Sequence, residues 1–121
     1  MAKILLVDDV EGIRISLHQV LEGMGHDVCE CSDVETAIGH LAKCCYDAVI
    51  TDLLMPDRDG YELVDYLSEE KPETKILVMS GGSSAVSTGL AIDSLRSEVN
   101  AVLVKPFSRK DFMDVVKGVI H

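Results

Sequence analysis

Side chains capable of metal or phosphoryl chemistry stand at the ends of short apolar runs in this sequence. The runs, each with the residues that follow it, are Lys3–Val7 with Asp8 and Asp9, Ala48–Thr51 with Asp52, Lys75–Met79 with Ser80, and Ala101–Val104 with Lys105. Three carboxylates, one hydroxyl and one amine therefore occupy equivalent places in the pattern. If the runs are neighbouring parallel strands, these five side chains meet at one edge of a sheet.

Asp8, Asp9 and Asp52 would repel one another at such an edge unless a cation or protons joined them. Carboxylate oxygens are hard ligands and no His or Cys accompanies them, so Mg²⁺ is favoured over zinc, with Mn²⁺ as an alternative. A Mg²⁺ ion held by few protein ligands keeps open positions that suit a phosphoryl group. Taken alone, the two adjacent aspartates are equally typical of a helix N-cap.

Asp52, Lys105 and Ser80 suit three different tasks in phosphoryl transfer. The Asp52 carboxylate can attack phosphorus and form an acyl phosphate. The ammonium group of Lys105 can pair with a carboxylate when the site is empty and with phosphate when it is filled. The Ser80 hydroxyl can donate to a phosphoryl oxygen. We therefore take these three residues as the candidate catalytic set, although an ordinary surface lysine is the alternative for Lys105.

The elements that must position these residues alternate between two periodicities. Continuous apolar runs are typical of buried parallel strands, and they cover Lys3–Val7, Asp27–Cys31, Ala48–Thr51, Lys75–Met79 and Ala101–Val104. Helical spacing lies between and after them, over Ile13–Met24, Val34–Leu41, Tyr61–Leu67 and Phe112–Val119, with a weaker helix in Ser83–Ser97. Ser108 and Asp111 resemble a capping box at the start of the last helix. This order predicts an α/β fold, a doubly wound five-stranded parallel sheet with five helices.

Composition narrows the class of protein. The chain has 121 residues, a formal net charge of −10 and 47% hydrophobic residues, which predicts one globular domain over residues 1–121. No apolar run approaches the length of a membrane span, and no secretion signal precedes the first run. An acidic chain is repelled by phosphate backbones, which disfavours direct nucleic-acid binding. We therefore expect a cytoplasmic domain that does not contact membrane or nucleic acid.

We predict no further metal or catalytic site at the cysteines or histidines. Cys29, Cys31, Cys44 and Cys45 lack the usual zinc spacing and are predicted to be small buried hydrophobes. His18 and His40 lie off the apolar helix faces and are predicted to face solvent.

The sequence resembles the receiver domain of two-component response regulators from end to end, with a chemotaxis-regulator-like, flavodoxin-like (βα)5 fold. The residues that carry the resemblance are Leu5-Leu6-Val7-Asp8-Asp9, the stretch from Asp52 to Gly60 with Met55, Pro56 and Asp59, then Ser80 and Lys105-Pro106-Phe107. The stretch after Asp52 is the most specific of these motifs. The alternating architecture is shared by many folds and adds little alone.

The resemblance implies that Asp52 is the phosphorylation site. Its phosphoryl group would come from a sensor histidine kinase or a histidine phosphotransfer protein. Asp8, Asp9 and Asp52 would hold Mg²⁺ together with the main-chain carbonyl of Leu54. The domain would be a signalling module rather than an enzyme, acting by contact with a downstream protein, and a phosphorylation-dependent homodimer is left open. A cis peptide bond before Pro106 is also expected.

One departure from the family pattern concerns the switch. Ser80 takes the hydroxyl position of the switch, but Val102 stands where the family commonly has Tyr or Phe. Valine has no ring to turn inward and few rotamers, so the usual readout through the last strand is in question. Two other functions therefore stay open: a receiver-like scaffold that binds partners without phosphorylation, and, with less support, a phosphatase that uses an aspartate nucleophile.

Overall fold

The computed structural model describes residues 2–53, 60–80 and 99–120 of the chain. Its elements are β1 (Lys3–Val7), α1 (Glu11–Gly23), β2 (Asp27–Cys31), α2 (Val34–Lys43), β3 (Ala48–Asp52), α3 (Gly60–Glu70), β4 (Lys75–Ser80), β5 (Ala101–Val104) and α5 (Arg109–Val119). The strands form one parallel sheet in the order β2-β1-β3-β4-β5. Four helices lie in the described residues, and the weaker helix predicted over Ser83–Ser97 lies outside them.

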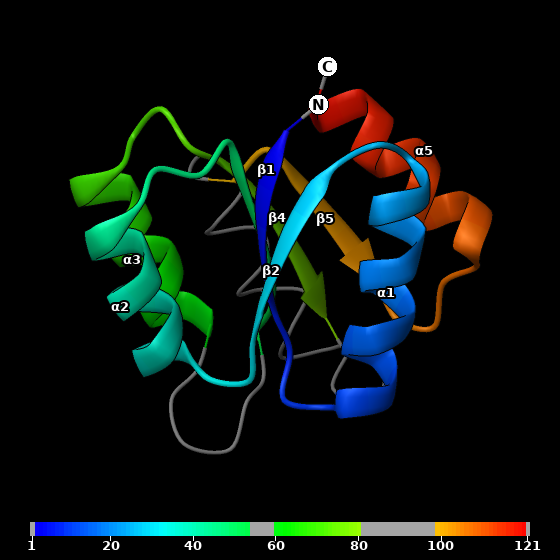
Figure 1. Cartoon of the computed structure of the whole chain (residues 1–121), viewed down its shortest axis with the longest axis horizontal. Coiled ribbons are helices and arrows are strands. Elements are labelled where there is room, and N and C mark those ends of the chain that lie inside the picture. The colour runs from blue at the N-terminus through cyan, green and yellow to red at the C-terminus, as the bar shows by residue number, and fades with distance from the viewer. Residues whose placement is uncertain (1, 54–59, 81–98, 121) are drawn as a thin grey trace.

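Two apolar layers cover the two faces of the sheet. Figure 1 shows α1 and α5 on one face and α2 and α3 on the other. Alternation along β1 divides its side chains between the layers, since Leu5 and Val7 pack toward α2 and α3 while Ile4 and Leu6 pack toward α1 and α5. All four are fully buried. The predicted doubly wound α/β sheet is confirmed, and it fixes all strand carboxyl ends at one edge.

Side-chain caps mark where α2 and α5 begin. The Ser108 hydroxyl accepts from the Asp111 main-chain N–H at 3.0 Å, and the Asp111 carboxylate accepts in return from the Ser108 N–H. The predicted capping box of α5 is therefore confirmed. Asp33 caps α2 by accepting from the Thr36 N–H at 2.7 Å.

Within the described ranges no helix combines the length and apolarity needed to cross a membrane.

The four cysteines do not share one environment. Cys31 is buried and Cys29 is half-buried, whereas Cys44 and Cys45 at the end of α2 are exposed. The prediction of buried hydrophobes is right for Cys31 and wrong for Cys44 and Cys45. The two exposed thiols lie where the chain leaves the helix, outside the apolar face that carries Val34, Ala37 and Leu41. Burial raises the pKa of the Cys31 thiol to about 12.

Alkylation should separate these thiols. In folded protein treated with iodoacetamide at pH 8, we expect Cys44 and Cys45 to be modified first, because the thiolate is the reactive form and both are open to solvent. Cys31 should react only after denaturation, because it is both buried and protonated at that pH. Peptide mass spectrometry on native and unfolded samples measures this. Equal native rates at Cys31 and Cys44 would contradict the packing described for β2.

Candidate functional site

The strand order brings the predicted residues to one edge of the sheet. β3 lies between β1 and β4, so Asp52 at the end of β3 is flanked by Asp8 just after β1 and by Ser80 at the end of β4. β3 and β4 each run one residue beyond the apolar pattern, so Asp52 and Ser80 are the last residues of their strands. Lys105 directly follows β5, and its main-chain N–H donates to the Ser80 carbonyl at 2.7 Å. The predicted convergence at the carboxyl ends is observed.

An acidic group forms the floor of this site. Asp8, Asp9 and Asp52 each offer a carboxylate oxygen, and these oxygens lie within 4.8 Å of one another. Asp8 is fully buried, Asp52 is 6% exposed and Asp9 is exposed. A donor set of three carboxylates, one of them exposed, fits Mg²⁺ or Mn²⁺, which prefer oxygen ligands and keep several waters.

Lys105 supplies the positive charge that this acidic group needs. Its Nζ lies 2.7 Å from Asp52 Oδ2 and 3.4 Å from Asp8 Oδ2. Burial raises the pKa of the Asp8 carboxyl, against the opposing effects of the Val10 N–H and Lys105. Burial by itself would lower the pKa of Lys105, but the hydrogen bond and charge of Asp52, with a contribution from Asp8, raise it above its ordinary value. The ammonium therefore stays charged where it can meet a phosphoryl group.

Ser80 adds a buried hydroxyl to this edge. Ser80 is 1% exposed. In the part of the chain that the structure describes, its Oγ is the one buried side-chain nitrogen or oxygen that has no hydrogen-bond partner. Leaving a buried hydroxyl unpaired costs about 1–3 kcal/mol. Such a group in a native protein calls for an explanation, and a phosphoryl oxygen as acceptor provides one.

The connection that carries Lys105 is held by its neighbours. The Phe107 ring stacks on Phe112 of α5, with 5.9 Å between the ring centroids, and Phe112 is fully buried. The peptide bond between Lys105 and Pro106 is cis, as expected from the resemblance. The stacking ties this connection to α5 through the buried Phe112 ring.

Two predicted site residues stand apart from this group. Leu54, expected to offer a carbonyl, lies outside the described residues. Val102 on β5 pairs with Val78 and is half-buried against the core layer under α2 and α3. The predicted switch position is therefore filled by a small branched side chain packed on the sheet.

The sequence interpretation missed a polar network beside the acidic group. Arg14 and His18 on α1 both contact the Glu30 carboxylate on β2. The prediction that His18 faces solvent is wrong, since its side chain is only 23% exposed; His40 is also half-buried, with Nδ1 3.8 Å from Cys29 Sγ. The available signal was the spacing of Arg14 and His18 by one helical turn, together with an acidic residue, Glu30, inside the strand that follows this helix.

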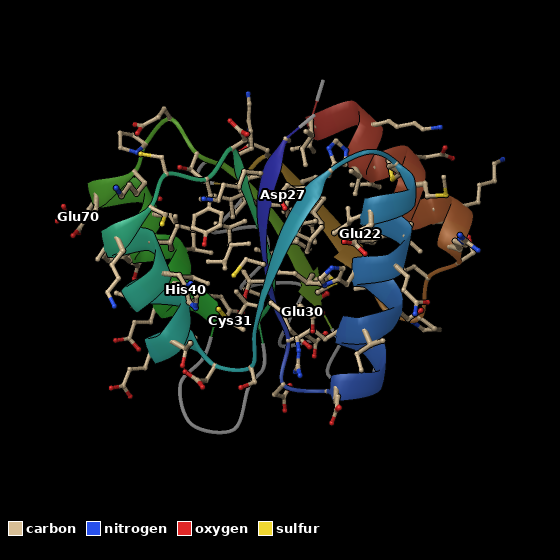
Figure 2. The ribbon with its side chains drawn as sticks, viewed as in Figure 1. Glu22, Asp27, Glu30, Cys31, His40 and Glu70 are labelled. Atoms are coloured by element: carbon tan, nitrogen blue, oxygen red, sulfur yellow. The ribbon has the colours of Figure 1, made fainter. Side chains whose placement is uncertain are left out.

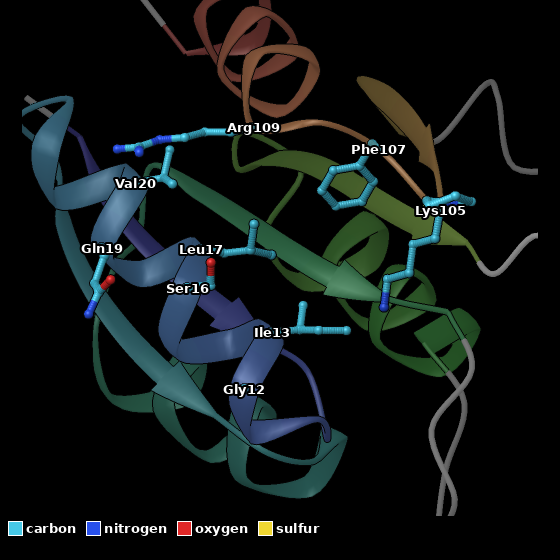
Figure 3. A pocket seen from close by; sticks show the side chains of 10 residues that line it. Gly12, Ile13, Ser16, Leu17, Gln19, Val20, Lys105, Phe107 and Arg109 are labelled. Atoms are coloured by element: carbon cyan, nitrogen blue, oxygen red, sulfur yellow. The ribbon is translucent and has the colours of Figure 1, made fainter.

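An apolar groove opens beside Lys105, between α1 and the connection from β5 to α5 (Figure 3). Its volume is about 910 Å³. Ile13 and Leu17 of α1 form one wall and Phe107 forms the other, while Ser16 lines the α1 side and Lys105 lies at the end nearest the acidic group. Because Lys105 belongs to both the groove and the acidic site, a molecule bound in the groove would lie beside that site.

Comparison with known proteins finds matches over almost the whole chain. A family model described as the response regulator receiver domain matches residues 4–117. The response regulator receiver protein CpdR of Brucella abortus is 30% identical over 120 residues, covering 99% of this chain and 98% of that protein. The DNA-binding transcriptional regulator NtrC of Azospirillum brasilense is 31% identical over 99% of this chain, which spans only 24% of the relative's length.

The structural comparison agrees with the sequence comparison. The chemotaxis response regulator CheY4 of Vibrio cholerae superimposes with a TM-score of 0.86 and 26% identity, covering 99% of both chains. The likeness therefore extends over the whole sheet and its helices and includes the edge where the acidic group lies.

Proposed function

Because the chain belongs to the response regulator receiver domain family, we propose that Asp52 accepts a phosphoryl group from the histidine of a sensor histidine kinase or a histidine phosphotransfer protein. Receiver domains of two-component systems are signalling domains rather than enzymes. The observation that carries the assignment to Asp52 is its 2.7 Å contact with the Lys105 ammonium beside the unpartnered hydroxyl of Ser80. The proposed domain extends over residues 1–121.

The transfer follows from these residues. An Asp52 carboxylate oxygen attacks phosphorus, the bond between phosphorus and the donor's histidine nitrogen breaks, and the electron pair of that bond returns to the imidazole. Lys105 moves from pairing with a carboxylate to pairing with the phosphoryl oxygens, where negative charge gathers. Ser80 donates its hydroxyl hydrogen to one of those oxygens. The result is an acyl phosphate on Asp52 with two protein contacts to its oxygens.

The family binds Mg²⁺ at an acidic pocket, and the carboxylates here fit that ion. We propose that Asp8, Asp9 and Asp52 hold Mg²⁺, or Mn²⁺ in its place, with the Leu54 carbonyl as a further ligand. When bound, the ion neutralises charge on the carboxylates and on the transferred group.

Ser80 and Val102 form the proposed switch. The Ser80 hydroxyl gains its partner on phosphorylation, which draws the end of β4 toward the phosphoryl group. Val102 packs next to Val78 on the neighbouring strand, so it contacts β4 without a ring that could rotate. The signal then passes to a downstream protein by contact. The two other functions are not favoured: a scaffold would not need a costly buried acidic group, and a phosphatase of this type carries a second aspartate where Leu54 stands.

Intact-mass spectrometry tests the proposed function. After incubation with acetyl phosphate and Mg²⁺, we expect the mass of one phosphoryl group to be added, and we expect EDTA to prevent the gain. Hydroxylamine should then remove the group, because it cleaves acyl phosphates. Folded protein that gains no mass would refute phosphoacceptor activity and return the scaffold to first place.

The groove of Figure 3 is proposed as the docking surface for the phosphodonor protein. A donor histidine must reach Asp52, and the groove is continuous with the site through Lys105. Ser16→Arg would place a long side chain in the groove from an exposed helix position. We expect it to slow transfer from a phosphotransfer protein at least tenfold, about 1.4 kcal/mol, while transfer from acetyl phosphate stays unchanged.

Ile15→Arg is the matched control for this experiment. Ile15 is 43% exposed on the same helix and does not line the groove, so the variant adds the same charge to α1. It should transfer like the wild type from both donors. Equal slowing by the two variants would indicate a general charge effect and exclude the groove as the docking surface.

A further inference from the structure

Arg14 links the strand β2 to the turn that carries the acidic pair. Its Nε donates to Glu30 Oε1 at 2.9 Å, and its Nη1 donates to the main-chain carbonyl of Asp8 at 2.8 Å. The side chain is 16% exposed. A guanidinium can hold both acceptors at once because its donors point in fixed directions in one plane. Arg14 thus acts on the backbone of the site rather than on the carboxylates.

Glu30 is the anchor of this arrangement. It stands on β2 on the side of the sheet that faces α1 (Figure 2), and its second carboxylate oxygen contacts His18 Nδ1. His18 Nε2 lies in turn 3.3 Å from Glu22 Oε2, one helical turn further on. A carboxylate held on both oxygens by one helix keeps a fixed position. Arg14 therefore has a rigid partner on the edge strand from which to hold the turn.

The turn after β1 needs such support because of Asp9. Asp8 has two further contacts: its N–H donates to the Cys31 carbonyl at 3.1 Å, and its Oδ1 accepts from the Val10 N–H at 2.9 Å, a bond that spans the Asp8–Asp9 peptide. The exposed Asp9 carboxylate makes no hydrogen bond in the part of the chain described by the structure. Its direction depends on the peptide plane between Asp8 and Asp9, and the carbonyl of that plane is the one that Arg14 holds.

We propose that Arg14, anchored by Glu30, is a positioning residue that sets the Asp8–Asp9 peptide plane and so directs the Asp9 carboxylate toward the divalent cation. This inference rests on the proposed function only in taking the acidic group to be the cation site. Outer groups that orient metal ligands typically contribute 10–100-fold in affinity. A guanidinium near the cation would weaken binding by charge alone, so any loss of affinity on its removal must come through geometry.

The test is a Mg²⁺ titration followed by backbone amide chemical shifts, which needs no phosphoryl transfer. For Arg14→Gln we expect the Kd for Mg²⁺ to rise about tenfold. Glu30→Ala should also raise the Kd for Mg²⁺. The double variant should have the same Kd as Arg14→Gln alone, because each substitution breaks the same Arg14–Glu30 pair. Lys117→Gln removes one positive charge from an exposed position in the last turn of α5 and should leave the Kd unchanged.

A second readout uses the metal-free protein. The Val10 amide, which donates to Asp8, should exchange its hydrogen at least fivefold faster in Arg14→Gln than in the wild type. An unchanged Kd with a lower melting temperature would make Arg14 a plain structural tie and overturn the proposal. If Arg14→Gln does not fold, Arg14→Lys, which keeps the charge but not the two-acceptor geometry, carries the same test.

The proposed cation site and the proposed positioning role of Arg14 can be refuted separately. Wild-type protein that binds no Mg²⁺ would refute the proposed cation site. An unchanged Val10 exchange rate in Arg14→Gln would refute the positioning role, whether or not Mg²⁺ binds.

Discussion

Asp52→Asn should abolish the Mg²⁺-dependent gain of a phosphoryl group and leave the protein folded. Asparagine has nearly the same shape as aspartate, and its amide oxygen can still accept a hydrogen bond from Lys105 Nζ, which lies 2.7 Å from Asp52 Oδ2. An amide is a far weaker nucleophile than a carboxylate, so no acyl phosphate forms. Intact-mass spectrometry with acetyl phosphate and Mg²⁺ measures the loss directly, and thermal unfolding checks the fold.

Asp65→Asn is the matched control for this prediction. Asp65 is an exposed residue of α3, and the substitution makes the same chemical change away from the sheet edge. It should gain one phosphoryl group as the wild type does. Continued phosphorylation of Asp52→Asn would mean that another carboxylate accepts the group. Asp8 and Asp9 would then be the first residues to examine by peptide mapping.

Much of the fold could be predicted because parallel strands leave a strong pattern. A strand buried on both faces reads as a continuous apolar run, as β1 and β3 do. The edge strands β2 and β5 are less buried, yet they too have the bounds that the sequence predicts. Polar residues that directly follow such runs fall at the carboxyl edge, so Asp52, Ser80 and Lys105 could be placed together before any geometry was known. The capping box at Ser108 could be predicted because it depends on local sequence alone.

The rest depends on contacts between distant residues. Arg14 and His18 lie 16 and 12 residues from Glu30, and on a helix they look like an ordinary solvated face. Only the pairing of β2 beside β1 places Glu30 under α1. Cys44 and Cys45 could not be placed for another reason, since apolar character alone does not tell whether small residues just after the end of a helix are exposed.

Lys105→Gln should move two properties of the site in opposite directions. The substitution removes the cation that lies 2.7 Å from Asp52 and 3.4 Å from Asp8, both of them buried. Phosphoryl transfer from acetyl phosphate should slow by about 100-fold, the usual cost of losing one preorganised group that stabilises charge in the transition state. Mg²⁺ should bind more tightly, because the ion no longer competes with an ammonium for the same carboxylates.

The folded protein without metal should also lose stability. Removing one partner of a buried ion pair leaves uncompensated charge and costs about 3 kcal/mol where the group is mostly buried, and the Lys105 side chain is 19% exposed. Added Mg²⁺ should restore more of the melting temperature in Lys105→Gln than it adds to the wild type. Thermal unfolding with and without Mg²⁺, beside transfer rates from intact mass, measures both effects.

Lys110→Gln provides the reference for charge alone. Lys110 is exposed in the first turn of α5, so its loss changes the net charge equally without touching the carboxylates. Its transfer rate and Mg²⁺ affinity should match those of the wild type. Weaker Mg²⁺ binding in Lys105→Gln would show that Lys105 helps to shape the cation site rather than compete for it. In that case the Lys105 ammonium would have to stay beside Asp52 while the cation is bound. Lys105 could then not change its partner from the carboxylate to the phosphoryl oxygens, as proposed.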